Sequence, residues 1–198
     1  MTEIAASPPR AVLIRAEGRV VSAGVNVAHF QRLDEQGALT VWREQLVMLE
    51  TLESLPCPTI FAAHALTLTA AFEVALGCDV ILSARSAKFG LVERRVGLTP
   101  ANGGVQRLAA LAGANRARDL VFSGELFDAE TMHAWGVVTR VFDDEGFNDA
   151  ALAYARDLAG GPTLGYGAVK ELIRQFTRGG VPAASQALFH KPSDRSFV

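Results

Sequence analysis

Two glutamates, Glu73 and Glu93, are the residues of this sequence best suited to acid–base chemistry. Glu73 stands in the segment AAFEVAL at 70–76, which reads as a helix with apolar residues on nearly every face. Burial disfavours the charged form of a carboxyl group and raises its pKa, which suits proton transfer near neutral pH. A helix whose glutamate faces solvent or a partner subunit accounts for the same pattern, so both interpretations stay open.

Glu93 follows the segment FGLV at 89–92 and precedes Arg94 and Arg95. The two arginines support a simple alternative, in which Glu93 belongs to an exposed ion pair on the surface. Two carboxyl groups that converge in the fold could instead hold one water molecule or one substrate atom between them. Separation along the sequence leaves both interpretations open.

The composition excludes several other classes of protein. The chain has 198 residues, of which 49% are hydrophobic and 20% charged, as expected for one compact domain. Its 19 basic and 21 acidic side chains form no basic stripe, which argues against nucleic-acid binding. Cys57 and Cys78 lack neighbours at disulfide or metal-ligand spacing, so no metal site is expected. The apolar stretch 59–82 contains Glu73 and Asp79, which argues against a membrane span.

Short apolar runs alternate with segments of helical periodicity along the chain. Strands are predicted at 11–14, 59–63, 80–83 and 137–142, and helices at 39–55, 70–76, 105–111, 114–122, 128–136, 148–158 and 168–176. Asp128 is the expected N-cap of its helix, and Gly179, Gly180 and Pro182 are expected to end the last one. This alternation predicts an α/β fold with a largely parallel sheet, in which Glu73 lies on a helix between two strands.

Several segments taken together resemble the enoyl-CoA hydratase/isomerase (crotonase) family. They are SAGVN at 22–26, FEVALGCD at 72–79, AKFGLVE at 87–93, GLTPANGGVQRL at 97–108, FSGE at 122–125 and WGVVTRV at 135–141. The resemblance covers 10–173 and implies an α/β fold of the ClpP/crotonase type, a spiral of ββα units followed by C-terminal helices. It implies a core over 1–146, with its first unit missing, and a helical oligomerisation region over 147–198. Both termini are expected to be shortened.

The resemblance also implies an acyl-CoA thioester substrate and an enolate formed from it. The backbone N–H groups of Val25 and Ala70 match the oxyanion hole, which stabilises the negative charge on the thioester oxygen. Glu73 would orient or deprotonate a water molecule, and Glu93 would deliver a proton to Cα. The remaining positions that match substrate-binding residues are Ala23, Gly24, Asn26 and Gly103.

These roles favour reversible hydration of a 2-enoyl-CoA. The resemblance also implies a homotrimer or homohexamer, and a cytoplasmic location is expected because the sequence shows no targeting segment. Isomerisation of a 3-enoyl-CoA is one alternative, and a catalytically silent assembly subunit is another. No metal or separate cofactor is expected, since CoA arrives as part of the substrate. The chain departs from the family at 69–71, where Thr-Ala-Ala replaces a glycine run, and at Val25 and Asn26. Trp42 and Phe30 are expected to border the acyl pocket.

Overall fold

The computed structural model describes residues 9–26, 28 and 32–189. The strands are β1 (Val12–Arg15), β2 (Thr59–Ala63), β3 (Thr67–Leu68), β4 (Val80–Ala84), β5 (Lys88–Gly90), β6 (Phe127–Asp128) and β7 (Arg140–Phe142). The helices are α3 (Glu35–Ser54), α4 (Ala70–Leu76), the 3₁₀ helix η1 (Glu93–Val96), α5 (Gly104–Ala112), α6 (Ala114–Ser123), α7 (Ala129–Ala134), α8 (Phe147–Gly160) and α9 (Thr163–Phe189). The α/β class predicted from the alternating pattern is confirmed.

Two sheets organise these elements. The larger has the order β1-β2-β4-β7 with every pair parallel, and the smaller has the order β3-β5-β6. In the smaller sheet β3 and β5 are parallel, whereas β5 and β6 are antiparallel. Two successive units, β2-β3-α4 and β4-β5-α5, each contribute their first strand to the larger sheet and their second to the smaller one. This is the ββα repeat that the resemblance implied.

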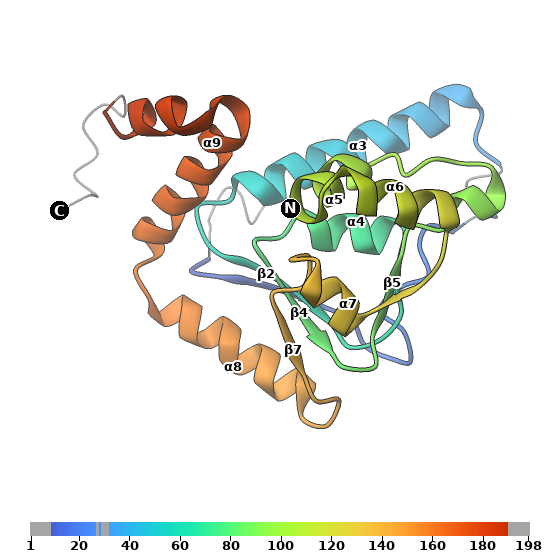
Figure 1. Cartoon of the computed structure of the whole chain (residues 1–198), viewed down its shortest axis with the longest axis horizontal. Helices are drawn as coiled ribbons and strands as arrows, with labels where there is room; N and C mark the ends of the chain where they lie inside the picture. Colours follow the sequence, from blue (N-terminus) through green and yellow to red (C-terminus); the bar gives the residue numbers. More distant parts are fainter. Residues whose placement is uncertain (1–8, 27, 29–31, 190–198) are drawn as a thin grey trace.

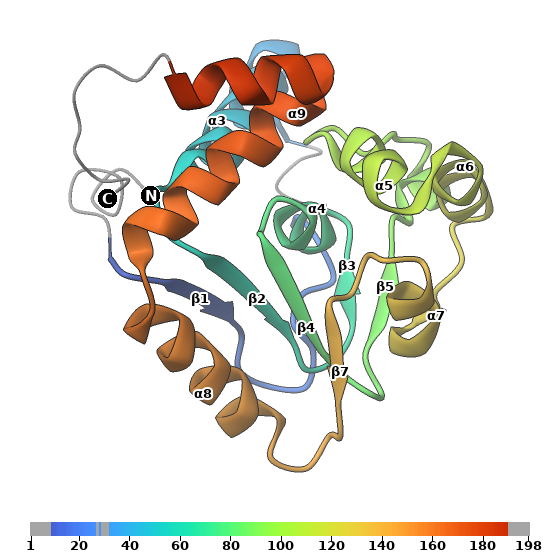
Figure 2. The ribbon, with the colours of Figure 1, turned by 60° about the vertical axis from the view of Figure 1, so that its left-hand side comes forward.

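Strand β2 shows how the larger sheet is buried on both faces. Successive side chains of a strand point to opposite sides, so Phe61 and Ala63 join the core around α4, while Ile60 and Ala62 face α8. Figure 2 shows the four strands side by side, with α8 along one face and α4 on the other. The helix that carries Glu73 is therefore enclosed by the sheet and by the helices that follow it.

Helix α9 differs from the sequence expectation. The glycines and the proline at 179–182 were expected to end the helix, but α9 continues to Phe189. Glycine and proline destabilise a helix without always ending it, and they often mark a bend. Figure 1 shows α9 changing direction towards its C-terminal end.

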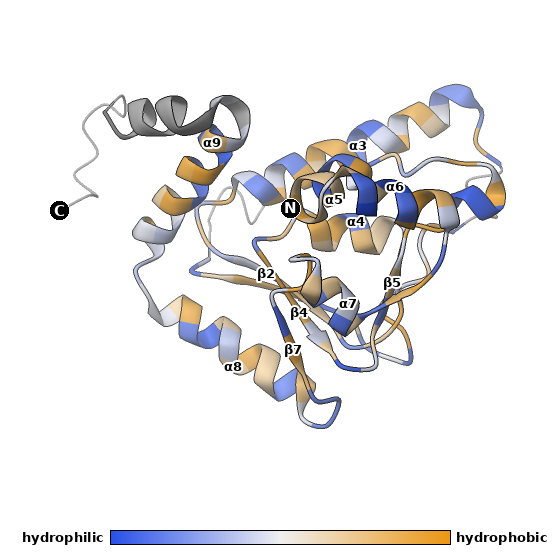
Figure 3. Cartoon of the chain, viewed as in Figure 1, coloured by the Kyte–Doolittle hydropathy of each residue, from blue (hydrophilic) through white to orange (hydrophobic). Residues whose placement is uncertain are grey.

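The first part of α9 carries large exposed apolar side chains. These are Leu164, Val169, Ile173 and Phe176, each more than half exposed. Figure 3 shows apolar bands along this part of α9. Lys170, on the same helix, ties it to the body: its ammonium lies 2.7 Å from Asp79 Oδ2 and donates to the Cys57 carbonyl at 3.1 Å.

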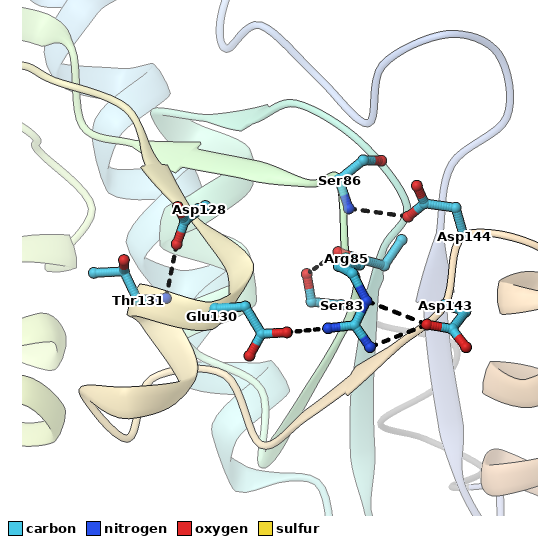
Figure 4. A network of polar contacts seen from close by, with 9 residues as sticks. Ser83, Arg85, Ser86, Asp128, Glu130, Thr131, Asp143 and Asp144 are labelled. Atoms are coloured by element: carbon cyan, nitrogen blue, oxygen red, sulfur yellow. Dashed lines mark hydrogen bonds and ion pairs between the residues drawn. The ribbon is translucent and has the colours of Figure 1, made fainter.

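A polar network ties the turn after β4 to α7 and to the segment after β7 (Figure 4). Arg85 donates to Asp143 Oδ1 through Nε and Nη2, at 3.2 and 3.0 Å, and pairs with Glu130. Asp144 accepts from the backbone N–H of Ser86 at 2.9 Å. These contacts fix the β4–β5 connection, and β5 leads directly into Glu93.

Besides α9, which also begins at Thr163 rather than at the expected position 168, two predicted boundaries differ by three residues or more. Helix α3 begins earlier than expected, because Asp34 caps it by accepting from Gly37 N. The strand expected from Val137 is limited to β7, because the N–H groups of Val137 and Val138 both turn back to Met132 O. The N-cap predicted at Asp128 is confirmed, since it accepts from Thr131 N at 2.8 Å. Within the described residues, no helix has the length and apolar character needed to cross a membrane.

Candidate active site

Glu73 is buried, with 2% of its surface exposed. Its carboxylate accepts three hydrogen bonds: Oε1 from the backbone N–H groups of Asn102 at 2.9 Å and Gly104 at 3.0 Å, and Oε2 from Asn102 Nδ2 at 3.0 Å. Buried carboxylates need such partners, because an unsatisfied charge away from water is costly. The solvent-facing interpretation of Glu73 is therefore wrong, and its carboxylate is held in one orientation.

Asn102 is fixed in turn by Arg107 of α5. Arg107 donates to the Asn102 carbonyl at 2.7 Å and to Glu53 Oε1 at 2.6 Å. Because Glu53 lies on α3, this chain of contacts connects α3, α5 and the carboxylate on α4. Gly104 adds a steric constraint, since a Cβ built there would lie 2.7 Å from Glu73 Cγ. The segment before α5 thus fits closely around Glu73.

Glu93 occupies a different environment. It is half-buried at the start of η1, and its Oε2 is buried without a hydrogen-bond partner among the described residues. Desolvation raises the pKa of this carboxyl from 4.5 to about 7, a backbone hydrogen bond opposes the rise, and the charge of Glu73 adds to it. The adjacent arginines bind elsewhere, since Arg94 donates to Ser123 O at 2.8 Å and Arg95 to Gly124 O at 2.7 Å. The surface-pair interpretation of Glu93 is therefore wrong.

Both glutamates line one cavity of about 470 Å³. Ala23, Val25 and Ala70 line the same cavity, and so do Trp42 and Gln45 of α3. The structure thus brings together five of the eight site residues expected from the sequence. Those five are Glu73, Glu93, Val25, Ala70 and Ala23.

The turn before Val25 is held against the start of α4. Ser22 bridges to Thr67 of β3, Leu68 N donates to Ser22 O at 3.0 Å, and Gly24 N donates to Ser22 Oγ at 3.1 Å. Because β3 leads within two residues to Ala70, this pairing brings the Val25 and Ala70 backbones to the same cavity. The hydrogen bonds of the described residues include none donated by either backbone N–H. The described part of the chain therefore offers neither N–H group a protein acceptor.

The other expected positions lie outside the cavity wall. The described residues that line the cavity do not include Gly24, Asn26 or Gly103. Gly103 instead adopts a positive φ of 79° as the N-cap of α5, where a Cβ would lie 2.4 Å from Arg107 Nη1. Phe30 falls outside the described residues.

Sequence reasoning missed Asn102 as the partner of Glu73. The available signal was a buried-type glutamate, which requires donors, together with an asparagine ahead of a Gly-Gly helix start. Among the described residues, no group of three or more His, Cys, Asp or Glu side chains is placed to hold a metal ion.

The family model described as "Enoyl-CoA hydratase/isomerase" matches residues 5–192. The chain belongs to the enoyl-CoA hydratase/isomerase family. Two curated relatives illustrate the range within it. The 1,2-epoxyphenylacetyl-CoA isomerase of Escherichia coli is 36% identical over 169 residues, which cover 83% of this chain and 64% of the relative. The probable enoyl-CoA hydratase EchA17 of Mycobacterium tuberculosis is 34% identical over 160 residues, covering 81% and 61%.

The chain therefore spans less than two thirds of the length of these curated relatives. Solved structures of the family confirm the crotonase fold. An enoyl-CoA hydratase from Bacillus anthracis superposes with a TM-score of 0.86 at 26% identity, over 96% of this chain and 78% of the other. An enoyl-CoA hydratase structure from Geobacillus kaustophilus superposes with a TM-score of 0.89 at 25% identity, over 96% of this chain and 76% of the other.

Proposed function

We propose that this chain catalyses the reversible addition of water to a 2-enoyl-CoA thioester. The observation that carries the proposal is the pair of glutamates on one cavity, each in a different environment. Environments that differ in this way commonly divide acid and base roles between two carboxyl groups. No metal ion is needed in this scheme, and CoA enters as part of the substrate.

In the proposed reaction Glu73 orients the attacking water and accepts its proton. Its three N–H donors fix the carboxylate, so that a lone pair can be aimed at a water in the cavity. Glu93, whose pKa of about 7 keeps a large fraction protonated near neutrality, delivers a proton to Cα as the water adds to Cβ. The raised pKa of Glu93 supports the acid role.

The thioester oxygen gains negative charge as the enolate forms. The N–H groups of Val25 and Ala70 supply the proposed oxyanion hole, and donors fixed before the reaction stabilise such charge effectively. The cavity beside Thr69 and Ala70 also favours an active site over a silent assembly subunit, for which a filled pocket was expected.

Isomerisation is a second candidate, supported by the isomerase among the relatives. A proton shift along the acyl chain needs only one acid–base residue. In that case Glu93 would remove and return the proton, and Glu73 would be dispensable.

The test is the loss of absorbance of the conjugated thioester when the protein is mixed with crotonyl-CoA. We expect turnover by the wild type and by Glu145→Gln, an exposed control, and none by Glu93→Gln or Glu73→Gln. A parallel assay with a 3-enoyl-CoA separates the two candidates, because isomerisation should survive Glu73→Gln. Equal loss in both assays for both variants would contradict this division of roles.

We also propose that α8 and α9 take part in self-assembly into trimers or hexamers. The exposed apolar side chains of α9 support this, because patches of that kind commonly mark interfaces. Sedimentation of the wild type against an Ile173→Asp variant tests it, with a smaller species expected for the variant. A monomeric wild type would refute the assembly proposal.

A further inference from the structure

Thr69 has an unusual backbone conformation at the entrance of α4. Its φ is 49° and its ψ is −123°, and among the described residues other than glycine it alone has a positive φ. A β-branched residue is rarely found there, because its side chain crowds the backbone. Strain of this kind persists where the surrounding structure imposes it, and it often occurs at functional sites.

The Thr69 hydroxyl lies against the Gly24 turn. A Cβ built on Gly24 would lie only 1.8 Å from Thr69 Oγ1, so the hydroxyl fills the space that a side chain at position 24 would occupy. Gly24 precedes Val25, and Thr69 precedes Ala70. The hydroxyl therefore contacts the turn that leads into Val25, and it belongs to the residue that precedes Ala70.

The same hydroxyl lacks a protein partner. Thr69 Oγ1 is buried with no hydrogen-bond partner among the described residues, although Thr69 lines the cavity. A buried hydroxyl without a partner is costly, and most such groups in proteins are satisfied by protein, water or ligand. A hydroxyl can rotate its hydrogen towards an acceptor, and the acceptor expected at this end of the cavity is a thioester oxygen.

We propose that the Thr69 hydroxyl donates a third hydrogen bond to the thioester oxygen, beside the backbone N–H groups of Val25 and Ala70. This inference rests on the proposed acyl-thioester substrate, but it does not depend on which reaction follows. In the alternative arrangement, here called a plug, the Thr69 side chain makes no hydrogen bond to the substrate and only narrows the oxyanion hole.

The test uses three substitutions that separate the hydroxyl from the shape of the side chain. Thr69→Ser retains the hydroxyl, Thr69→Val replaces it with a methyl group of similar size, and Thr69→Gly removes the whole side chain. The probe is cinnamoyl-CoA, whose conjugated thioester absorbs at longer wavelength when its carbonyl is polarised. The spectra are recorded in the Glu93→Gln background to prevent turnover, and crotonyl-CoA kinetics are measured without that change.

If the hydroxyl donates, the absorbance of bound cinnamoyl-CoA should show a full red shift with Thr69 or Thr69→Ser. The shift should be smaller with Thr69→Val and Thr69→Gly. A donor role also predicts a kcat at least about 10-fold lower for Val, with near-normal activity for Ser. Thr69→Gly should raise the melting temperature, because glycine adopts this φ without strain, yet it should lose the red shift as Val does. That combination separates a donor from a structural role.

A full red shift and normal kcat in Thr69→Val would overturn the proposal, and so would faster turnover by Thr69→Gly, the result expected of a plug. A red shift that depends on the hydroxyl without hydration of any enoyl-CoA would support the Thr69 assignment while refuting the proposed hydratase reaction. Failure of cinnamoyl-CoA to bind would overturn both.

Discussion

Replacing Glu93 by glutamine tests the environment of this carboxyl group without requiring turnover. Burial, with a smaller contribution from the charge of Glu73, raises its pKa from 4.5 to about 7. Between these pH values the folded protein holds a proton that the unfolded chain has released. Because the folded state binds more protons in this interval, the free energy of unfolding falls as the pH rises.

The size of this change in the free energy of unfolding follows from the difference between the two pKa values of Glu93. A rise from 4.5 to about 7 corresponds to about 3 kcal/mol for a fully buried group. Glu93 is only half-buried, so solvent screening reduces the expected effect to about 1 to 2 kcal/mol. This stability is fully present below pH 4.5 and is lost as the pH rises through about 7. A glutamine is neutral throughout, so Glu93→Gln removes the dependence.

The assay is urea unfolding at pH 5 and pH 8 of the wild type, Glu93→Gln and the control Glu145→Gln. From pH 5 to pH 8, the free energy of unfolding of Glu93→Gln minus that of the wild type should rise by about 1 to 2 kcal/mol. The exposed control should follow the wild type. An equal difference between Glu93→Gln and the wild type at both pH values would refute the reasoning.

Three further predictions concern the site and its support. Gly104→Ala should lower kcat by about 10- to 100-fold, because its Cβ would lie 2.8 Å from Oε1 of the Glu73 carboxylate. The control is Gly160→Ala, where the added Cβ meets open space, and its kcat should be unchanged. A normal kcat in both variants would contradict the proposed fit around Glu73. The kcat/KM for hydration should fall above about pH 7 as Glu93 loses its proton, whereas a flat profile from pH 6 to pH 9 would exclude it as the acid. Lys170→Met should lower the free energy of unfolding in urea by about 2 kcal/mol, because it leaves the partly buried Asp79 without its ammonium partner, and an unchanged midpoint would show that this pair contributes little.

Local patterns predicted the elements that carry the site. The helix expected at 70–76 has those bounds in the structure, since the apolar run around Glu73 is enclosed on both sides by buried strands. Strands β2 and β4 were equally predictable from short β-branched runs. The apolar residues around Glu73 could not show whether its carboxylate faces solvent, because its burial depends on contacts with the segment before α5.

The contacts that define the site come from residues far apart in the sequence. Asn102 reaches Glu73 across 29 positions, and Arg107 reaches Glu53 across 54. The spacing of apolar residues along the chain carries no information about such pairings. The smaller sheet was also missed, because its strands contain only two or three residues and are held by pairing rather than by propensity. The positive φ of Thr69 likewise results from its place between β3 and α4.

The different environments of the two glutamates follow from where the chain places N–H donors. The turn into α5 directs backbone N–H groups and the Asn102 amide at Glu73, whereas Oε2 of Glu93 has no hydrogen-bond donor in the part of the chain that the structure describes. Burial without donors favours the protonated form of a carboxyl group, in agreement with the raised pKa of Glu93. A single change at the α5 turn should therefore disturb Glu73 while leaving the protonation of Glu93 dominated by burial. This separation is why Gly104→Ala and Glu93→Gln probe the proposed base and the proposed acid independently.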